Sequence, residues 1–505
     1  MNIPILSLTL FIPVIGAIII MILPPERERA IKYVAAVATL ISLLLSLVVT
    51  AGYNLSQGGM QFVEKISWTP DLGVSYALGV DGISIPMLLL TTLIGFSAVY
   101  ASWHINDRVK EFFSLLLILI TGVMGTFLTT DLFIFFLFYE VVVIPIYLMV
   151  IMWGSSKRVT KEYAGMKLTI YLLIGSAFLL VGLISLFVKS LAINGIPSMD
   201  ILTLAQTDFP VGFQVFVFTL MAFGFGTLLS MFPFHAWSPD GYAGAPTAVS
   251  MIHAGVLKKI GGYGLIRIGI MILPSGAQII APIIAVLALG NVIYAAFICL
   301  SQKDLKYIVG YSSVSHMGYV LLGIAALNLI SINGAVIMMF AHGVMAALFF
   351  AMIGNLYEKS HTRNVDDFGG LAHQMPRLAT GFMIAGLASL GLPGMVNFIG
   401  EFTIFVGAFS TYKIITIIAV SGIIFTALYI LRTMANVLFG PRKSEWDHLQ
   451  DLKGPEMVPL IVLGAAIIIG GIIPFTLMDF ISNGVGSLIA HVGFLQMGVF
   501  YNAAY

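Results

Sequence analysis

Charged residues are scarce in this sequence. Asp, Glu, Lys and Arg together make up 9% of its 505 residues, hydrophobic residues make up 59%, and the mean hydropathy is +1.03. A soluble domain usually has about a quarter of its residues charged, because they cover its surface. The composition therefore excludes a soluble enzyme domain and indicates a chain embedded in lipid.

Cysteine is almost absent as well. Because Cys299 is the only one, the chain can form no internal disulfide and cannot hold an iron–sulfur cluster by itself. The sequence also lacks a strand–GxGxxG–helix pattern for a flavin or nicotinamide, and its histidines lack the HExxH spacing of a metal site. We expect no metal, cofactor or redox centre on this chain, and the net charge of +1 gives no indication of a nucleic-acid partner.

Long apolar runs are abundant. Runs of about 18 to 25 residues recur throughout, each long enough to cross a hydrocarbon core as a helix. They predict an all-α polytopic membrane protein of about fourteen transmembrane helices with no soluble domain between them. The first run lacks a basic flank and a cleavage site, so we interpret it as a retained helix. The helices are predicted near 3–23, 32–51, 82–102, 112–130, 131–153, 164–188, 211–240, 246–270, 279–301, 305–327, 332–356, 378–408, 412–438 and 458–482, and the apolar tail after Ser482 leaves room for another short segment.

Basic residues are divided unevenly between the two sets of predicted loops, and Lys and Arg gather on cytoplasmic, matrix or stromal loops. The loops after even-numbered helices, with the adjoining helix ends, contain only Lys65, Lys189, Arg267 and Lys413. The loops after odd-numbered helices contain Arg27, Arg29, Lys32, Arg108, Lys110, Lys157, Arg158, Lys161, Lys303, Lys306, Lys359, Arg363, Arg377, Arg442, Lys443 and Lys453. This asymmetry supports the helix count and predicts that both termini lie on the outer side.

Proline interrupts two predicted helices inside apolar stretches. Pro233 lies in the seventh helix and Pro393 in the twelfth. Because these helices are an odd number apart, they run in opposite directions across the membrane. Transporters with inverted repeats and broken helices have this pattern, although prolines also kink ordinary membrane helices.

Ionisable residues occur deep inside the apolar segments. Glu140 and Glu401 are the two acidic ones, and a charge there costs at least about 2.5 to 3.5 kcal/mol on insertion scales. Each is either part of a structural ion pair or a protonatable site. Lys258 and Lys259 are the cations at this depth, and adjacent side chains on a helix point about 100° apart, so the two lysines cannot face one pathway in the same way.

Other basic residues lie nearer the helix ends. We interpret Lys167, Arg267 and Arg432 as anchors whose long side chains reach the membrane interface.

Histidine can relay protons near neutral pH. His316 and His342 both fall in the middle of predicted helices. A lone membrane histidine usually only forms hydrogen bonds, but two beside buried Lys and Glu favour a relay. His235 and Asp240 follow the first proline break as further candidates, and the sequence assigns no role to His253.

Several motifs resemble one known family, the antiporter-like subunits of respiratory complex I. The motifs are FGFG at 223–226, FPFHAWSPD at 232–240, APTA at 245–248, the segment 254–267 and GYSSVSHMG at 310–318. These subunits are similar to the large subunits of multisubunit sodium/proton antiporters. The resemblance covers most of the chain and implies three N-terminal helices (1–111), two inverted five-helix repeats (112–270 and 279–438), a last helix with its tail (458–505), and proton transfer along a central hydrophilic axis.

The resemblance also implies roles for single residues. Glu140 matches the family's glutamate of the fifth helix, Lys259 the central lysine of the eighth, and His316 and His342 the connecting histidines. Glu401 favours the type called M in bacteria, D in chloroplasts and 4 in mitochondria, because the sibling subunits L and N usually have lysine there. Glu401 would then hand protons on or release them.

One position departs from the family. A lysine usually stands seven residues before the histidine of the H-x-W-x-P-D stretch and pairs with the fifth-helix glutamate, but here the residue is Leu228. Lys258 stands where the family is usually apolar, and we hypothesise that it supplies the lost charge. Alternatively, the first half-channel is altered or inactive, with Glu140 neutral or paired to His235.

The resemblance implies a proton-translocating membrane-arm subunit of a complex I-like NAD(P)H:quinone oxidoreductase, and thus of a translocase, driven by electron transfer elsewhere. Quinone, flavin and iron–sulfur clusters are then expected in partner subunits. The expected partners are the L-, N- and K-type subunits and lipids, in a bacterial or archaeal plasma membrane, a thylakoid or an inner mitochondrial membrane. A subunit of a Na+/H+ antiporter or membrane-bound hydrogenase, and a pump-inactive scaffold suggested by Leu228, are the alternatives.

Overall fold

The computed structural model describes residues 4–155 and 158–493. Ile3 of the first predicted helix, the basic residue Lys157 and the tail 494–505 lie outside the described residues.

Within the described ranges, twelve helices are long and apolar enough to cross a membrane, and each overlaps one predicted helix. Helices suit this environment because they satisfy their own backbone hydrogen bonds where no water is present. The twelve are α1 (Ile5–Ile22), α2 (Glu28–Gly52), α3 (Ser84–Ala101), α4 (Val109–Leu128), α5 (Leu132–Trp153), α6 (Lys161–Asn194), α8 (Val211–Leu228), α12 (Pro274–Ser301), α13 (Leu305–Ala325), α14 (Leu329–Ser360), α18 (Lys413–Met434) and α19 (Met457–Ile472), the last two with adjoining turns. The prediction of a helical membrane protein is confirmed.

The two other predicted helices are irregular: the eighth is a continuous helix with two π-helical turns, and the twelfth is broken. The eighth consists of α10 (Thr247–Ile252) and α11 (Lys258–Gly264), each followed by a π-helical turn, His253–Leu257 and Leu265–Ile270. The twelfth consists of α16 (Pro376–Ser389) and α17 (Val396–Thr411), with Pro393 between them. The predicted helix 211–240 also divides, since α9 (Trp237–Gly244) follows α8 after a non-helical stretch that contains Pro233.

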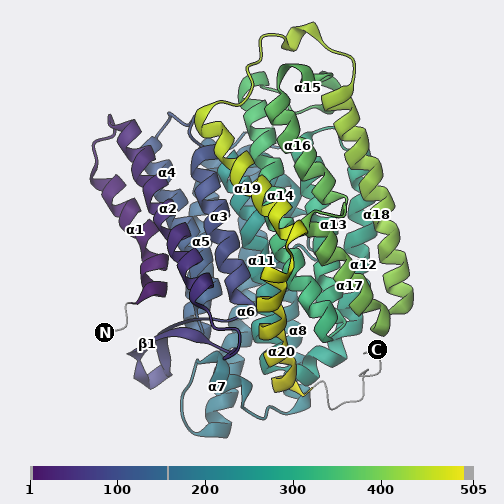
Figure 1. Cartoon of the computed structure of the whole chain (residues 1–505). Coiled ribbons are helices and arrows are strands. Elements are labelled where there is room, and N and C mark those ends of the chain that lie inside the picture. The colour runs from purple at the N-terminus through teal and green to yellow at the C-terminus, as the bar shows by residue number, and fades with distance from the viewer. Residues whose placement is uncertain (1–3, 156–157, 494–505) are drawn as a thin grey trace.

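The last predicted helix is divided as well. α20 (Phe475–Val492) follows α19, with Pro474 at the junction. Gly471 at the end of α19 packs against the backbone of Gly394, beside the break between α16 and α17. Figure 1 shows α19 descending from one face and α20 continuing to the other. The apolar stretch after Ser482 therefore extends this segment and forms no separate crossing up to Val492.

The long linker 52–81 is not a simple loop. It forms an antiparallel hairpin of β1 (Gln61–Thr69) and β2 (Val74–Val80), in which Lys65 is paired with Ala77. Lys65 Nζ lies 3.1 Å from Asp200 Oδ2, next to the short helix α7 (Ile201–Ala205).

Both described ends of the chain lie at the face that carries this hairpin (Figure 1). The backbone N–H of Leu6 donates to Glu64 of β1 at 2.8 Å, and His491 Nε2 lies 3.2 Å from the carbonyl of Ala205 in α7. The chain therefore crosses between the two faces an even number of times, as a count of fourteen requires.

The core of the bundle is formed by α13 and α14. The membrane-crossing window of α14 is wholly buried, whereas α1, α2, α6 and α18 expose large apolar side chains such as Ile22 (77% exposed) and Ile414 (74%). Such faces suit lipid or neighbouring subunits. The short helix α15 (Leu371–Gln374) lies on the loop face opposite the hairpin (Figure 1).

Side-chain caps hold the starts of three inner helices. Asp131 accepts hydrogen bonds from the first turn of α5, and Asp304 does the same for α13. Asn328 and Ser331 form a capping box at the start of α14. Caps satisfy backbone donors that the helix leaves free, so they fix where these helices begin.

Candidate functional site

Two consecutive lysines begin α11, between the two π-helical turns. Lys258 and Lys259 are both 0% exposed. Lys259 Nζ donates to the carbonyl of Ala254 in the preceding π turn at 2.5 Å and lies 2.9 Å from Nδ1 of His342. π-helical turns are rare and often occur at functional sites; here one supplies a carbonyl that orients the ammonium group.

From Lys259, a row of buried ionisable groups extends through α14 and α13 to α17. The rings of His342 and His316 are 5.5 Å apart between centroids, and His316 Nε2 lies 3.6 Å from Oε1 of Glu401. Nε2 of His342 is buried without a hydrogen-bond partner. All four residues are at most 4% exposed. Lys259, His342, His316 and Glu401 are hereafter called the buried row.

The break between α16 and α17 shapes the end of this row. Gly391 has a φ of +65°, which glycine adopts without strain. The carboxylate of Glu401 occupies the space that a side chain at Gly391 would fill. The carbonyl of Ser389, the last residue of α16, lies 3.1 Å from His316 Nε2. The interrupted helix thus supplies both a place for the carboxylate and a free carbonyl acceptor.

His316 faces carbonyl oxygens with both ring nitrogens, because its Nδ1 lies 2.7 Å from the carbonyl of Ser312. Tyr429 OH donates to Ser312 Oγ at 2.9 Å, on the same side of the ring. Only the imidazolium form carries an N–H on both nitrogens, so only that form can donate to both carbonyls. When His316 carries a proton, both carbonyls can therefore accept a hydrogen bond from it, between Lys259 and Glu401.

Glu140 lies outside the buried row. It is half-buried on α5, and its Oε1 has no hydrogen-bond partner. Leu228, the last residue of α8, is 1% exposed and offers no charge. Within the part of the chain that the structure describes, no ion pair joins Glu140 to Lys258 or to His235.

Lys258 instead points to a different set of partners. Its Nζ donates to Ser313 Oγ at 3.2 Å and lies 5.0 Å from the ring centroid of Tyr242. The predicted pairing of Lys258 with Glu140 is therefore wrong. The reason is that residue 258 faces α9 and α13, whereas Glu140 lies on α5.

Asp240 and Lys167 form a second ionic site. Lys167 Nζ lies 2.7 Å from Asp240 Oδ2, and Tyr307 OH donates to Oδ1 at 2.8 Å. Lys167 is thus an ion-pair partner rather than only an interface anchor. His235 lies in the break between α8 and α9, 5% exposed, with its Nδ1 unpartnered.

The sequence analysis missed one buried ion pair. Arg267 is 4% exposed and its guanidinium contacts Asp81, which is also 4% exposed. The prediction that Arg267 reaches the interface is therefore wrong, because Asp81 at the start of α3 gives it a carboxylate partner inside the bundle. The apolar residues on both sides of Arg267 could have indicated that this side chain is buried. Arg432 is exposed, as an anchor is expected to be.

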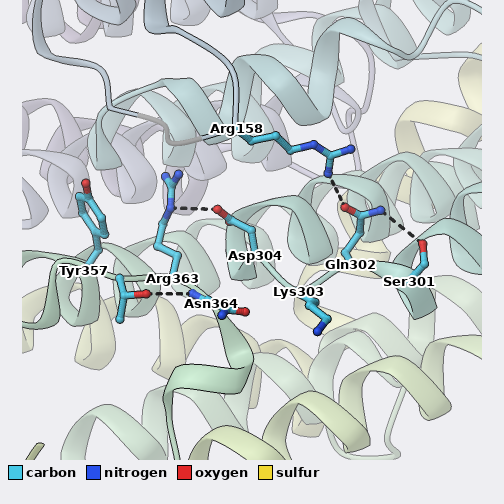
Figure 2. Close-up of a pocket in the computed structure, with 9 residues that line it drawn as sticks. Arg158, Ser301, Gln302, Lys303, Asp304, Tyr357, Arg363 and Asn364 are labelled. Carbon is cyan, nitrogen blue, oxygen red and sulfur yellow. Dashed lines mark hydrogen bonds and ion pairs between the residues drawn. The ribbon is translucent and has the colours of Figure 1, made fainter. Parts of the chain in front are cut away.

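Among the described residues, no group of three or more His, Cys, Asp and Glu side chains is arranged to hold a metal ion. A pocket of about 400 Å³ lies instead among the loops (Figure 2). In it Arg158 contacts Gln302, and Arg363 Nε lies 3.3 Å from Asp304 Oδ2. None of the residues that line it belongs to the buried row.

Residues 129–426 match the family described as NADH:quinone oxidoreductase/Mrp antiporter, transmembrane. The chain belongs to this family. The match contains every residue of the buried row, together with Glu140, Lys258 and the two proline breaks. Family membership and the helices that can span a bilayer together make the chain an integral membrane protein.

Individual relatives cover nearly the whole chain. An NAD(P)H-quinone oxidoreductase chain 4 from Synechococcus sp. (strain JA-3-3Ab) is 38% identical over 93% of this chain and 90% of its own length. NADH-quinone oxidoreductase subunit M of Rhodobacter capsulatus is 34% identical over 96% of both. A chain of respiratory complex I from Thermus thermophilus superposes with a TM-score of 0.87, at 25% identity, covering 96% of this chain and 99% of that one. The resemblance to M-type subunits is confirmed.

Proposed function

We propose that this chain is the M-type proton-translocating subunit in the membrane arm of a complex I-like quinone oxidoreductase. Electron transfer in other subunits, which bind the quinone, flavin and iron–sulfur clusters, drives proton movement through this chain. Its neighbours in the membrane are L-, N- and K-type subunits, its two five-helix repeats are inverted, and its termini lie on the outer side.

The observation that carries the proposal is the buried row itself. Four ionisable side chains from α11, α14, α13 and α17 lie next to one another inside an apolar bundle, joined by 2.9 Å between Lys259 and His342 and by 3.6 Å between His316 and Glu401. Each such group is costly in lipid. A structural ion pair would need only two ionisable side chains, whereas proton transfer across the bundle requires a series of them.

The groups of the row can exchange protons in either direction. The Lys259 ammonium gives a proton to Nδ1 of His342 at hydrogen-bond distance, which leaves a neutral amine and an imidazolium. Water is needed between His342 and His316, since their rings are 5.5 Å apart and Nε2 of His342 is unpartnered. His316 then passes the proton to the carboxylate of Glu401. Charge changes in neighbouring subunits would set the direction by favouring one protonation state over another.

A second candidate function is a pump-inactive scaffold. Leu228 and the unpartnered Oε1 of Glu140 favour it, because the family's ion pair between the fifth and seventh helices is missing. The family description also includes Mrp antiporters, so sodium/proton exchange is the third candidate.

The test compares Lys259→Met and Glu401→Gln variants in membrane vesicles that contain the assembled complex. Proton uptake, electron transfer and assembly on native gels are measured together. We expect the protons pumped per electron to fall in both variants while the complex assembles. Exposed residues provide matched controls, Lys413→Met and Glu445→Gln, which should keep the wild-type proton yield.

Wild-type proton yield in both buried variants would refute the pump and favour the scaffold. Sodium uptake that follows the proton gradient without electron transfer would favour the antiporter.

A further inference from the structure

We propose that Lys258 is a second proton-carrying lysine, which receives protons from a polar pocket beneath the basic loops and refills Lys259. The inference rests on the proposed function and adds an entry route to it. It replaces the predicted pairing with Glu140, which the structure does not form.

Lys258 is fully buried but lacks a carboxylate. It contacts the Ser313 hydroxyl at 3.2 Å and the face of the Tyr242 ring at 5.0 Å. Four titratable groups interact electrostatically with Lys258: Lys259, His235, His253 and His342. All of these are bases, so no anion among the described residues holds a permanent charge on Lys258.

Buried polar atoms without hydrogen-bond partners gather around this lysine. They are both ring nitrogens of His253 and Nδ1 of His235, beside the hydroxyls of Tyr242, Ser238 and Ser313, which lie close enough to interact with one another. Ser238 and Tyr242 lie one turn apart on α9, and the His253 ring lies 5.0 Å from the rings of both Trp237 and Tyr242. Buried polar atoms in native proteins are almost always satisfied, often by ordered water. This cluster therefore indicates a hydrated pocket that borders the Lys258 ammonium.

The pocket lies between Lys258 and a partly exposed ionic site, the pair of Lys167 and Asp240. Lys258 and Lys167 are both close enough to act electrostatically on the His235 ring. Lys167 pairs with Asp240, and the side chains of this pair are 21% and 17% exposed. Protons can therefore enter at Asp240 and pass His235 to reach Lys258.

The two lysines contact different groups. Lys259 contacts His342 and the buried row, whereas Lys258 contacts the polar pocket. Because two adjacent buried ammonium groups repel each other, protonation of one opposes protonation of the other. A proton taken up by Lys258 from water therefore drives the proton of Lys259 onto His342. Lys258 then passes its own proton through water to the neutral Lys259, which restores the starting state with one proton moved.

The test measures protons pumped per electron in vesicles with the assembled complex, for Lys258→Met, Lys258→His and Lys258→Arg beside Lys259→Met. We expect Lys258→Met to lose as much proton yield as Lys259→Met while electron transfer and assembly persist. Lys258→His should restore part of the yield because histidine still titrates. Lys258→Arg should not, because arginine keeps its proton.

The outcomes separate the inference from the proposed function. Normal pumping in Lys258→Met together with a loss in Lys259→Met overturns the role of Lys258 and leaves the proposed function standing. Full rescue by Lys258→Arg also overturns it, since a fixed positive charge would then suffice. If Lys258→Met fails to assemble, the contrast between the His and Arg variants decides. Normal pumping in Lys259→Met refutes the proposed function itself.

Discussion

The buried ion pair of Asp81 and Arg267 allows a quantitative prediction. Asp81 Oδ1 also accepts hydrogen bonds from the backbone N–H groups of Ile83 and Ser84 at 3.0 Å. In an Asp81→Asn variant the amide oxygen can keep these bonds, so the substitution mainly removes the counter-charge of Arg267. Both residues are 4% exposed, and water therefore cannot screen the charge that remains.

Breaking a buried pair by removing one partner costs about 3 to 5 kcal/mol. If the pair is lost in the transition state for dissociation, about 3 kcal/mol corresponds to roughly a hundredfold faster loss of the assembled complex at fixed temperature. Arg267→Met alone should show a similar loss, since it leaves the Asp81 carboxylate unpaired. The Asp81→Asn/Arg267→Met double variant should recover most of the stability, because no buried charge remains.

The assay follows the fraction of intact complex on native gels during incubation at one temperature, for wild type, both single variants and the double variant. The four rates form a double-mutant cycle. Additive effects in the double variant would refute the reasoning, because they would mean that the two side chains do not stabilise the fold through each other.

Two further predictions concern the Glu401 end of the buried row and the start of α5. Gly391→Ala should lower the proton yield, because its Cβ would meet the Glu401 carboxylate. Gly394→Ala is the control, since Gly394 also has a positive φ (+94°) but no atom lies within 4 Å of an added Cβ. Equal loss of proton yield in both variants would contradict this prediction. Burial raises the pKa of Asp131, at the edge of α5, to about 6. This group therefore contributes stability below about pH 4 that is lost as the pH rises through about 6. The thermal midpoint of the complex should fall over that window in wild type and change less in Asp131→Asn, and an unchanged slope in the variant would contradict the prediction.

The membrane class and most helices could be predicted from the sequence because hydropathy is a local property. A run of apolar residues spans a bilayer whatever lies beside it, and the prolines at 233 and 393 lie where helices α8 and α16 have ended. The hairpin of β1 and β2 was missed since its residues are too few and too polar to give a hydropathy signal. The division at Pro474 was missed because the apolar run continues through it.

Residue partners were predicted less well, since they depend on which helix faces meet. Arg267 near a helix end suggested an anchor, but Asp81, far away in the sequence, lies against it. Lys258 and Glu140 have opposite charges and similar depth in the sequence, yet Lys258 contacts α9 and α13 whereas Glu140 lies on α5.

The scarcity of charge and the position of each ionisable residue within apolar runs are properties of the sequence alone. They determined that this is a membrane protein with Glu140, Lys258, Lys259, His316, His342 and Glu401 in its interior-forming segments. Only the tertiary structure decided that four of these form one row, that Lys258 contacts Ser313 and Tyr242, and that Glu140 has no cationic partner in the described chain. The reason is that the burial of a residue follows from the hydropathy of its own helix, whereas its side-chain partners depend on how several helices cross one another.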